Sequence, residues 1–288
     1  MTTTENLTQK KRFRPADKAG FGGVALGNGF QHNADLECLQ AVEAAWNAGI
    51  RLFDTSPWYG LGISERRMGL FLKDQPRDSF TLSTKVGRLM LPHEDFKMEQ
   101  SLWKGKLNFA YKYDYSAAGV RRSIEESLQG WGLGVNTVEP ILQTLEVADP
   151  DIFLSACQYS LIKHDEDLNR VFPKVAERGI SIVVGAPLCA GFLSGKDRYL
   201  YDGTFPAGVK EKLNALQRVA KNHAVELRTA ALQFAATPDE VSGVIPGAHT
   251  ADQAVQNAHA FNAKVPSDFW KELKHEKLIE EHAPVPNK

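Results

Sequence analysis

The feature that most constrains the fold is an alternation of short β-rich runs with segments of helical periodicity along 288 residues. The clearest run is 180–185, in which Ile182, Val183 and Val184 follow one another without a polar break. A strand that is buried on both faces of a parallel sheet has this character. Repeated strand–helix units therefore predict an α/β chain built on a parallel sheet.

Apolar spacing and turn residues predict the elements in more detail. Strands are expected at 21–27, 51–54, 80–85, 153–157, 180–185 and 241–245. Helices are expected at 35–48, 64–72, 120–128, 138–145, 168–175, 209–222 and 226–236. Thr250 and Gln253 form a capping box at the start of a further helix. The stretch 88–115 is aromatic and aperiodic, which is typical of a functional loop.

Composition limits the classes of function. Lys and Arg number 34 against 35 Asp and Glu, so no basic field is available for a nucleic acid or a membrane surface. The three cysteines lie far apart and form no CxxC pair, so no disulfide framework or metal site is predicted, and a reducing cytoplasm fits. No signal peptide is evident, and no run reaches the roughly 18 apolar residues of a membrane span.

An acid, a phenol and an amine are expected at one edge of the sheet. Asp54 ends one predicted strand, Lys85 ends the next, and Tyr59 follows Asp54 on a Gly- and Pro-containing loop. A nearby ammonium favours a phenolate and lowers the pKa of a tyrosine, while a carboxylate orients the ammonium. Such a phenol exchanges a proton with a carbonyl or an alcohol. The matching hydride has to come from a nicotinamide cofactor, because side chains cannot supply one.

The residues around this trio resemble the aldo-keto reductase family. The motif runs through Phe53-Asp54-Thr55-Ser56-Pro57, Tyr59-Gly60, Gly62, Ser64-Glu65 and Gly69, and Ser83-Thr84-Lys85-Val86-Gly87 resembles the lysine strand of that family. The match continues in patches to Ile245-Pro246-Gly247-Ala248. The resemblance implies a single (β/α)8 barrel of the TIM type over 1–288, with 1–18 as a tail or entry strand. It also implies that Asp54, Tyr59 and Lys85 are catalytic.

Cofactor contacts are implied by the same resemblance. A Gly-containing turn at the start of a helix suits a phosphate group, and barrels often bind phosphate after their last two strands. The residues that match the cofactor-binding positions of the family are Gly22, Gly23, Asn136, Pro187, Leu188, Gly191, Leu193, Gly247, His249, Thr250, Gln253 and Asn257. Many relatives carry Arg or Lys at the position of His249, to pair with the 2′-phosphate of NADP. A histidine there favours NAD over NADP, or the use of both.

The sequence does not fit the Rossmann dinucleotide motif. The pairs Gly60-x-Gly62 and Gly130-x-Gly132-x-Gly134 contain glycines, but neither completes GxGxxG between a strand and a helix. The chain also lacks a GxSxG elbow and an HExxH zinc motif.

One part of the expected barrel is missing from the sequence. Between the helices expected to end near 129 and to begin near 137 there are too few residues for a strand, a helix and a second strand. The resemblance implies that the fourth strand–helix unit and part of the fifth strand are absent, with a junction near 130–134. The catalytic histidine of the family then has no counterpart. His164 is expected to be an exposed turn residue rather than its substitute.

The resemblance also implies a class of substrate. The Gly-rich opening at 22–28 and the aromatic stretch are most similar to the aldose 1-dehydrogenases and pyridoxal 4-dehydrogenases, which implies a small sugar or aldehyde substrate and no nucleic-acid or membrane partner. Trp58 and the aromatic residues at 103–115 are candidates to stack on that substrate, or to pack the barrel rim. The alternatives are an NADPH-dependent aldehyde reductase, a cofactor-binding pseudoenzyme without turnover, and a non-functional truncated product. The oligomeric state is not predicted.

Overall fold

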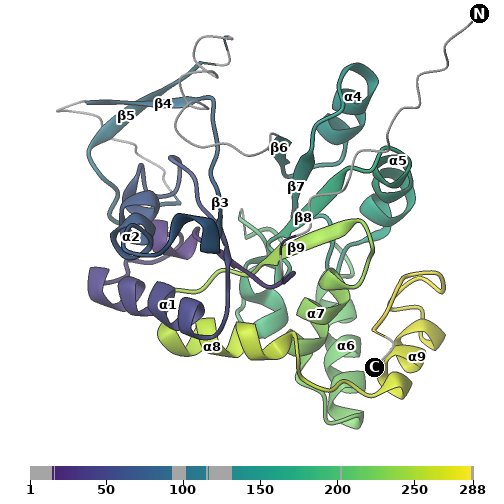
Figure 1. Cartoon of the computed structure of the whole chain (residues 1–288). Coiled ribbons are helices and arrows are strands. Elements are labelled where there is room, and N and C mark those ends of the chain that lie inside the picture. The colour runs from purple at the N-terminus through teal and green to yellow at the C-terminus, as the bar shows by residue number, and fades with distance from the viewer. Residues whose placement is uncertain are drawn as a thin grey trace, which may run out of the picture.

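Parallel strands form the centre of the molecule (Figure 1). The computed structural model describes residues 15, 17–92, 102–114, 116, 132–201 and 203–286. Within these residues, one sheet has the order β1-β2-β3 and another has the order β6-β7-β8-β9, and every neighbouring pair in both is parallel. The bounds are β1 Gly20–Gly22, β2 Leu52–Asp54, β3 Thr81–Ser83, β6 Gly132–Val135, β7 Ile152–Ala156, β8 Ser181–Gly185 and β9 Val241–Ile245.

The two sheets meet at a seam between β1 and β9. Isolated parallel bridges join Ala19 to Val244 and Gly22 to Gly247, and the Gly22 amide donates to Pro246 O at 3.0 Å. Glycine is needed here, because a Cβ atom on Gly22 would lie 2.8 Å from the Ile245 carbonyl oxygen. The strands on both sides of the seam therefore form one curved, seven-stranded parallel surface in the described part of the chain.

This surface is a barrel-type sheet that does not close. Its two outer strands are β3 and β6, and no ladder joins them among the described residues. The expected barrel architecture is confirmed, and the opening lies where the fourth strand was expected to be missing. The short run Gly132–Val135, expected to be the tail of a strand, pairs in parallel with β7.

Helices cover the outer face of the strands (Figure 1). Their bounds are α1 Asp35–Asn47, α2 Ile63–Leu72, α4 Glu139–Val147, α5 Phe172–Glu177, α6 Val209–Asn222, α7 Leu227–Ala236, α8 Ala251–Ala260 and α9 Ser267–His275. One hydrophobic core lies under α4 to α7 and α9, and a second lies between β1, β2, α1, α2 and α8. A small inner cluster of Leu52, Val183 and Ile245 fills the concave side of the strands.

Several expected elements differ in the structure. The stretch expected to be an aperiodic loop contains an antiparallel hairpin, β4 Arg88–Pro92 paired with β5 Phe109–Tyr113. The first strand ends at Gly22, because Ala25–Gly27 tightens into a 3-10 turn. Helix α9 was not expected. The helix expected at 120–128 lies outside the described residues.

Two findings bear on the class of protein. In the described residues, every helix is too short or too polar to cross a membrane. Cys38, Cys157 and Cys189 are buried and are not joined in disulfides.

Candidate functional site

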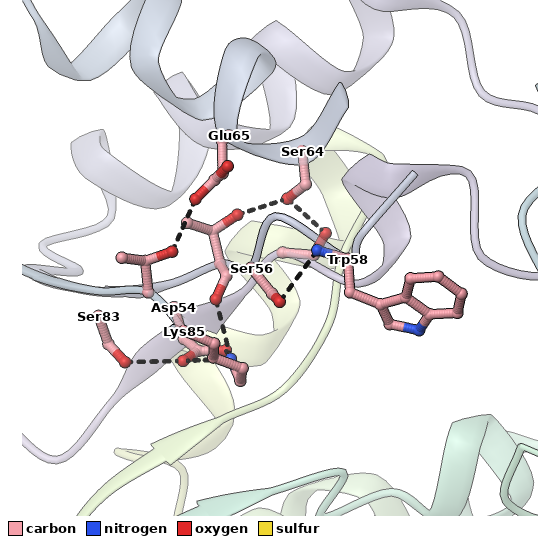
Figure 2. Close-up of polar contacts among 10 residues, drawn as sticks. Asp54, Ser56, Trp58, Ser64, Glu65, Ser83 and Lys85 are labelled. Carbon is pink, nitrogen blue, oxygen red and sulfur yellow. Dashed lines mark hydrogen bonds and ion pairs between the residues drawn. The ribbon is translucent and has the colours of Figure 1, made fainter. Parts of the chain in front are cut away.

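Asp54 and Lys85 form an ion pair at the carboxyl ends of β2 and β3, as Figure 2 shows. Lys85 Nζ donates to Asp54 Oδ1 at 3.0 Å, to Oδ2 at 2.9 Å and to the Thr55 carbonyl oxygen at 2.8 Å. Asp54 is buried, while the Lys85 side chain is 28% exposed. Ser83 Oγ also donates to Asp54 Oδ1, at 2.9 Å. Parallel register between Asp54 and Ser83 brings these groups together.

Tyr59 lies beside the ion pair. Its ring centre is 4.8 Å from Lys85 Nζ, and the turn that carries it is held by a hydrogen bond from the Tyr59 amide to Ser56 O at 3.0 Å. The expectation that Lys85 lowers the pKa of the phenol is wrong. Burial raises the pKa of Tyr59 well above its usual value, and the negative charge of Asp54 raises it further. The ammonium contacts the ring face and is engaged by Asp54, so it does not offset burial.

Side chains of α2 hold the ends of these strands. Ser64 Oγ donates to the Gly23 carbonyl oxygen at 2.8 Å and lies 2.9 Å from Thr55 Oγ1. Thr84 Oγ1 donates to Glu65 Oε1 at 2.7 Å, and burial raises the pKa of Glu65. Figure 2 shows both contacts above the ion pair. These hydrogen bonds fix the backbone on each side of Asp54 and Lys85.

Trp58 points away from the ion pair in Figure 2. Arg88 Cζ lies 3.9 Å from the centre of its ring, and Tyr111 and Trp103 contact it edge-on at 5.0 and 5.8 Å. The indole is therefore packed between the hairpin and the loop at 102–105. This packing against the barrel rim is one of the two roles expected for Trp58. The other role, stacking on the substrate, stays a prediction.

The N-terminus of α8 has the expected capping box. Thr250 Oγ1 accepts a hydrogen bond from the Gln253 amide at 3.2 Å, and Gln253 Oε1 accepts one from the His249 amide at 3.1 Å. Asn257 Nδ2 donates to the Gly247 carbonyl oxygen at 3.4 Å. Gly247 itself is exposed, and a Cβ atom there would meet only Gly22 O, at 3.7 Å. The turn thus presents open backbone at the positive end of a helix, which fits a phosphate group.

His249 is half-buried beside the loop that follows β1. Its Nε2 atom lies 3.1 Å from Gln31 Nε2. Burial lowers the pKa of His249, Lys196 lowers it further and Glu37 raises it. The imidazole is therefore neutral at neutral pH, and the positive charge of Lys196 acts on it.

The segment after β8 winds into a 3-10 turn, Cys189–Ser194. Gly191 has φ of 99°, and a Cβ atom there would lie 2.8 Å from Lys196 Cγ. The side chain of Leu193 belongs to the hydrophobic core, and Leu188 packs against it. Pro187 is buried. Any contact of Leu193 with a cofactor would use its backbone rather than its side chain.

The remaining cofactor candidates lie at neighbouring strand ends. Asn136 follows β6, and its carbonyl oxygen accepts a hydrogen bond from Gln158 Nε2 at 2.5 Å. Gly22 and Gly23 follow β1, and the Gly23 amide donates to Asp54 O at 2.8 Å. Gln158 was not singled out from the sequence, because a glutamine after a strand carries no signal by itself.

Arg67 is a further residue that sequence reasoning missed. It is buried, and its guanidinium donates to Asp35 Oδ1 at 2.8 Å, Leu26 O at 2.6 Å, Asn28 Oδ1 at 2.7 Å and Asn33 O at 2.8 Å. These bonds hold the loop after β1 against α2. The signal in the sequence was a charged residue, Arg67, on the face of the predicted helix 64–72 that is expected to be buried.

No histidine joins the trio in the part of the chain that the structure describes. Tyr59, Asp54 and Lys85 have no hydrogen bond, ion pair or ring contact with a histidine there. His164, expected to be exposed, is buried: its Nδ1 lies 2.8 Å from Ser160 O and its Nε2 pairs with Glu280. His93 lies outside the described residues.

Comparison with curated proteins finds relatives among sugar and pyridoxal dehydrogenases. A D-threo-aldose 1-dehydrogenase from a Pseudomonas species is 29% identical, with 90% of this chain and 94% of that protein covered. A pyridoxal 4-dehydrogenase from Microbacterium luteolum is also 29% identical, with the same coverage. The first alignment runs over 317 positions, more than this chain has residues, so that relative contains positions without a counterpart here.

Solved structures share the fold. An aldo-keto reductase from Bacillus halodurans in its holo form superposes with a TM-score of 0.66 at 21% identity, covering 97% of this chain and 99% of that one. A glycerol dehydrogenase from Gluconobacter oxydans superposes with a TM-score of 0.64 at 19% identity, covering 98% of each.

The family model described as "Aldo/keto reductase family" matches residues 18–139 and 130–276. The two matched segments overlap at 130–139, close to the expected junction. The proteins of this family are oxidoreductases that use a nicotinamide cofactor. The chain belongs to the aldo/keto reductase family.

Proposed function

We propose that this chain is an NAD(P)-dependent oxidoreductase that interconverts an alcohol or hemiacetal with a carbonyl or lactone. The observation that carries the proposal is the buried Asp54–Lys85 pair with the Tyr59 ring against its ammonium, at the carboxyl edge of the sheet. The similarity to aldose and pyridoxal dehydrogenases supports a small sugar or a pyridoxal-like alcohol as the substrate.

Tyr59 is the group that exchanges the proton. Its raised pKa keeps the phenol protonated at neutral pH, so it is a proton donor to a carbonyl oxygen in the direction of reduction. In the direction of oxidation it must first lose that proton. Asp54 fixes the position of Lys85, and Lys85 fixes the Tyr59 ring through its face.

The residues at the ends of β1, β8 and β9 suit a dinucleotide. We assign the pyrophosphate to the exposed Gly247 turn and the segment from Pro187 to Leu193, the adenosine end to Thr250, Gln253 and Asn257, and the nicotinamide to Gly22, Gly23 and Asn136. When bound there, the cofactor supplies or accepts the hydride. Exposed backbone at Gly247 and the cap of α8 are the structural support for this assignment.

We propose NAD as the preferred cofactor, because the neutral His249 replaces a fixed cation at the expected 2′-phosphate position. The neighbouring Lys196 supports NADP as the alternative. A reductase of aldehydes is the second candidate function, favoured by the protonated state of Tyr59. A pseudoenzyme that binds cofactor without turnover is the third, and the open edge beside Lys85 supports it.

The first experiment is a titration of the purified chain with NADH and with NADPH, followed by quenching of tryptophan fluorescence. The Trp103 ring lies 5.8 Å from the Tyr59 ring and 5.8 Å from the Trp58 ring, so two of the five tryptophans report on the site. Saturable binding, followed by turnover of an aldose or of pyridoxine in either direction, is expected. Binding without turnover of any alcohol or aldehyde would establish the pseudoenzyme instead, and no binding would reject all three functions.

A further inference from the structure

Arg88, on the β4–β5 hairpin, is held among three aromatic rings. Its guanidinium carbon lies 3.9 Å from the centre of the Trp58 ring, 4.9 Å from that of Tyr113 and 5.1 Å from that of Tyr111. The two tyrosine rings contact each other edge-on, with centres 5.7 Å apart. Because Arg88 and Tyr113 are cross-strand partners, the register of β4 with β5 brings the cation and these rings together.

These rings adjoin the loop that carries Tyr59. Trp58 directly precedes Tyr59, and the centre of the Trp103 ring lies 5.8 Å from the centres of both their rings. The Leu107 amide donates to the Gly60 carbonyl oxygen at 3.2 Å, so the segment that leads into β5 is fixed to the same loop. The hairpin and the proposed proton donor are therefore parts of one packed unit.

The guanidinium of Arg88 has N–H donors available for a ligand. Its Nη2 donates to Tyr113 Oη at 2.7 Å, and Arg88 has no other hydrogen bond and no carboxylate partner among the described residues. The contact with Trp58 uses the flat face of the guanidinium, which leaves N–H groups along its edge open. Such an edge binds a carboxylate or a phosphate through paired hydrogen bonds, and arginine stays charged at any ordinary pH.

The rim around Arg88 is cationic. In the described residues 86–92 and 102–114, the cationic side chains are Arg88, Lys104, Lys106 and Lys112, and Asp114 is the one acid. The whole chain has a net charge of −1, so this positive excess is local. A surface of one sign attracts ligands of the opposite sign.

We infer that Arg88 binds an anionic group of the substrate, a carboxylate or a phosphate, at the end remote from the carbon that reacts beside Tyr59. This inference rests on the proposed function. Trp58, whose ring contacts Arg88, points away from the Asp54–Lys85 pair in Figure 2, so the guanidinium lies on the outer side of the site. A sugar acid or a sugar phosphate, with its anion at one end and its reacting carbon at the other, suits this arrangement.

The aromatic contacts make Arg88 an effective anchor. A guanidinium that is already held against Trp58 and Tyr113 loses little side-chain freedom when an anion binds. Arg88 does not reach the reacting atoms, so it should stabilise the bound substrate and the transition state equally. An interaction of this kind lowers KM and leaves kcat unchanged.

Arg88→Met tests the inference, because methionine keeps apolar contact with Trp58 and removes the charge. D-glucose, D-glucuronate and D-glucose 6-phosphate share the anomeric carbon and differ at the remote end, where the last two carry an anion. We expect kcat/KM for the preferred anionic sugar to fall by about 10- to 100-fold, mainly through KM. The value for glucose should stay within about twofold of wild type. The larger loss shows whether a carboxylate or a phosphate is preferred.

Binding measured without turnover is the second readout. Titration calorimetry of the NADH-loaded chain with D-glucuronate and with D-glucose 6-phosphate should show saturable binding of at least one anion, weakened about tenfold or more in Arg88→Met. Arg88→Lys should give an intermediate affinity, because lysine keeps the charge but lacks the planar pair of donors.

Arg51→Met is the matched control. The Arg51 guanidinium carbon lies 3.8 Å from the centre of the Trp46 ring, a contact of the same kind, but Arg51 precedes β2 at the end opposite to Asp54. Its Nη1 donates to the Trp46 and Ile50 carbonyl oxygens at 2.7 and 2.8 Å, so the melting temperature should fall. The ratio of kcat/KM for anionic and neutral sugars should be the wild-type ratio.

The outcomes separate this inference from the proposed function. Equal losses on neutral and anionic sugars in Arg88→Met would overturn the inference, because Arg88 would then only hold the hairpin in place. Unchanged values for all three sugars, or a wild-type chain that binds neither anion, would also overturn it. Anion binding that depends on Arg88, in a wild-type chain without turnover of any alcohol or aldehyde, would support the anion site and reject the proposed oxidoreductase.

Discussion

Lys85 Nζ contacts the face of the Tyr59 ring, 4.8 Å from its centre, while both oxygens of Asp54 accept hydrogen bonds from the same ammonium. The ammonium thus orients the phenol ring, while its hydrogen bonds go to the Asp54 carboxylate. Because the ammonium is paired with Asp54, it does not offset burial, and burial raises the pKa of Tyr59. The arrangement is suited to a neutral phenol that donates a proton, and this property leads to the first two predictions.

Tyr59→Phe should reduce turnover by about 10²–10⁴-fold, because only the proton-exchanging hydroxyl is lost. The ring contacts with Lys85 and Trp103 remain possible in the variant. Steady-state kinetics and fluorescence titration with NADH are the measurements, and cofactor affinity should be unchanged. Turnover close to wild type would remove Tyr59 from the role assigned to it.

The pH dependence should differ between the two directions of reaction. Because the pKa of Tyr59 is raised, reduction should show no loss from this group as the pH rises from 6 to 9, while oxidation should keep rising through that range. Initial rates in both directions, measured at saturating substrate, test this. A plateau of the oxidation rate below pH 8 would indicate a different base.

Lys85→Met should destabilise the fold more than Asp54→Asn does. The first change leaves the buried Asp54 carboxylate with Ser83 as its side-chain donor, and a broken buried pair costs about 2–4 kcal/mol. In Asp54→Asn, the partly exposed Lys85 ammonium can still donate to the Thr55 carbonyl oxygen and be hydrated by solvent. Urea denaturation of the two variants and of the double variant gives the coupling energy. Equal losses in both single variants would contradict this account.

His249→Arg should improve the affinity for NADPH by about tenfold relative to NADH, since a fixed cation replaces a neutral ring. Fluorescence titrations with both cofactors measure the ratio. Lys196→Met is the companion variant, and it should weaken NADPH binding if Lys196 provides the alternative cation. An unchanged ratio in His249→Arg would mean that the 2′-phosphate lies elsewhere.

Because of Asp167, the free energy of unfolding should decrease as the pH rises. It is buried, Ser155 Oγ donates to its Oδ2 at 2.8 Å, and burial raises its pKa from the usual 3.8 to about 6. The folded chain therefore binds more protons than the unfolded chain between these values, and stability decreases through that window. Relative to wild type, Asp167→Asn should gain about 2 kcal/mol between pH 4.5 and pH 8. Urea denaturation at the two pH values is the test, and a constant difference would contradict it.

The barrel-type fold was predictable from the sequence, because buried parallel strands such as β8 and β9 leave continuous apolar runs. The capping box at Thr250 was equally predictable, since its two hydrogen bonds are local. The β4–β5 hairpin was not, because Met90 and Tyr111 pair across a long insertion and neither strand shows a clean alternation. Helix α9 was missed as well, although Phe269, Trp270 and Leu273 have helical spacing.

The polar residues of the candidate site were only partly predictable. Asp54, Tyr59 and Lys85 were found because a motif places them at strand ends. The direction of the pKa shift of Tyr59 was predicted wrongly, because proximity to a cation does not reveal which part of the ring the cation contacts.

The seam between β1 and β9 has a mechanical consequence. Asp54 ends β2 and Lys85 follows β3 on one side of the seam, whereas the turn Cys189–Ser194 follows β8 on the other side. A closed barrel would join these two halves along two seams, but the described strands join them along one. A small rotation about this seam would change the distance between the Asp54–Lys85 pair and the segment that follows β8. Side chains added at Gly20, Gly22 and Gly243 would collide with Ile245 or Leu52, so the close approach of the two halves depends on glycine at these positions.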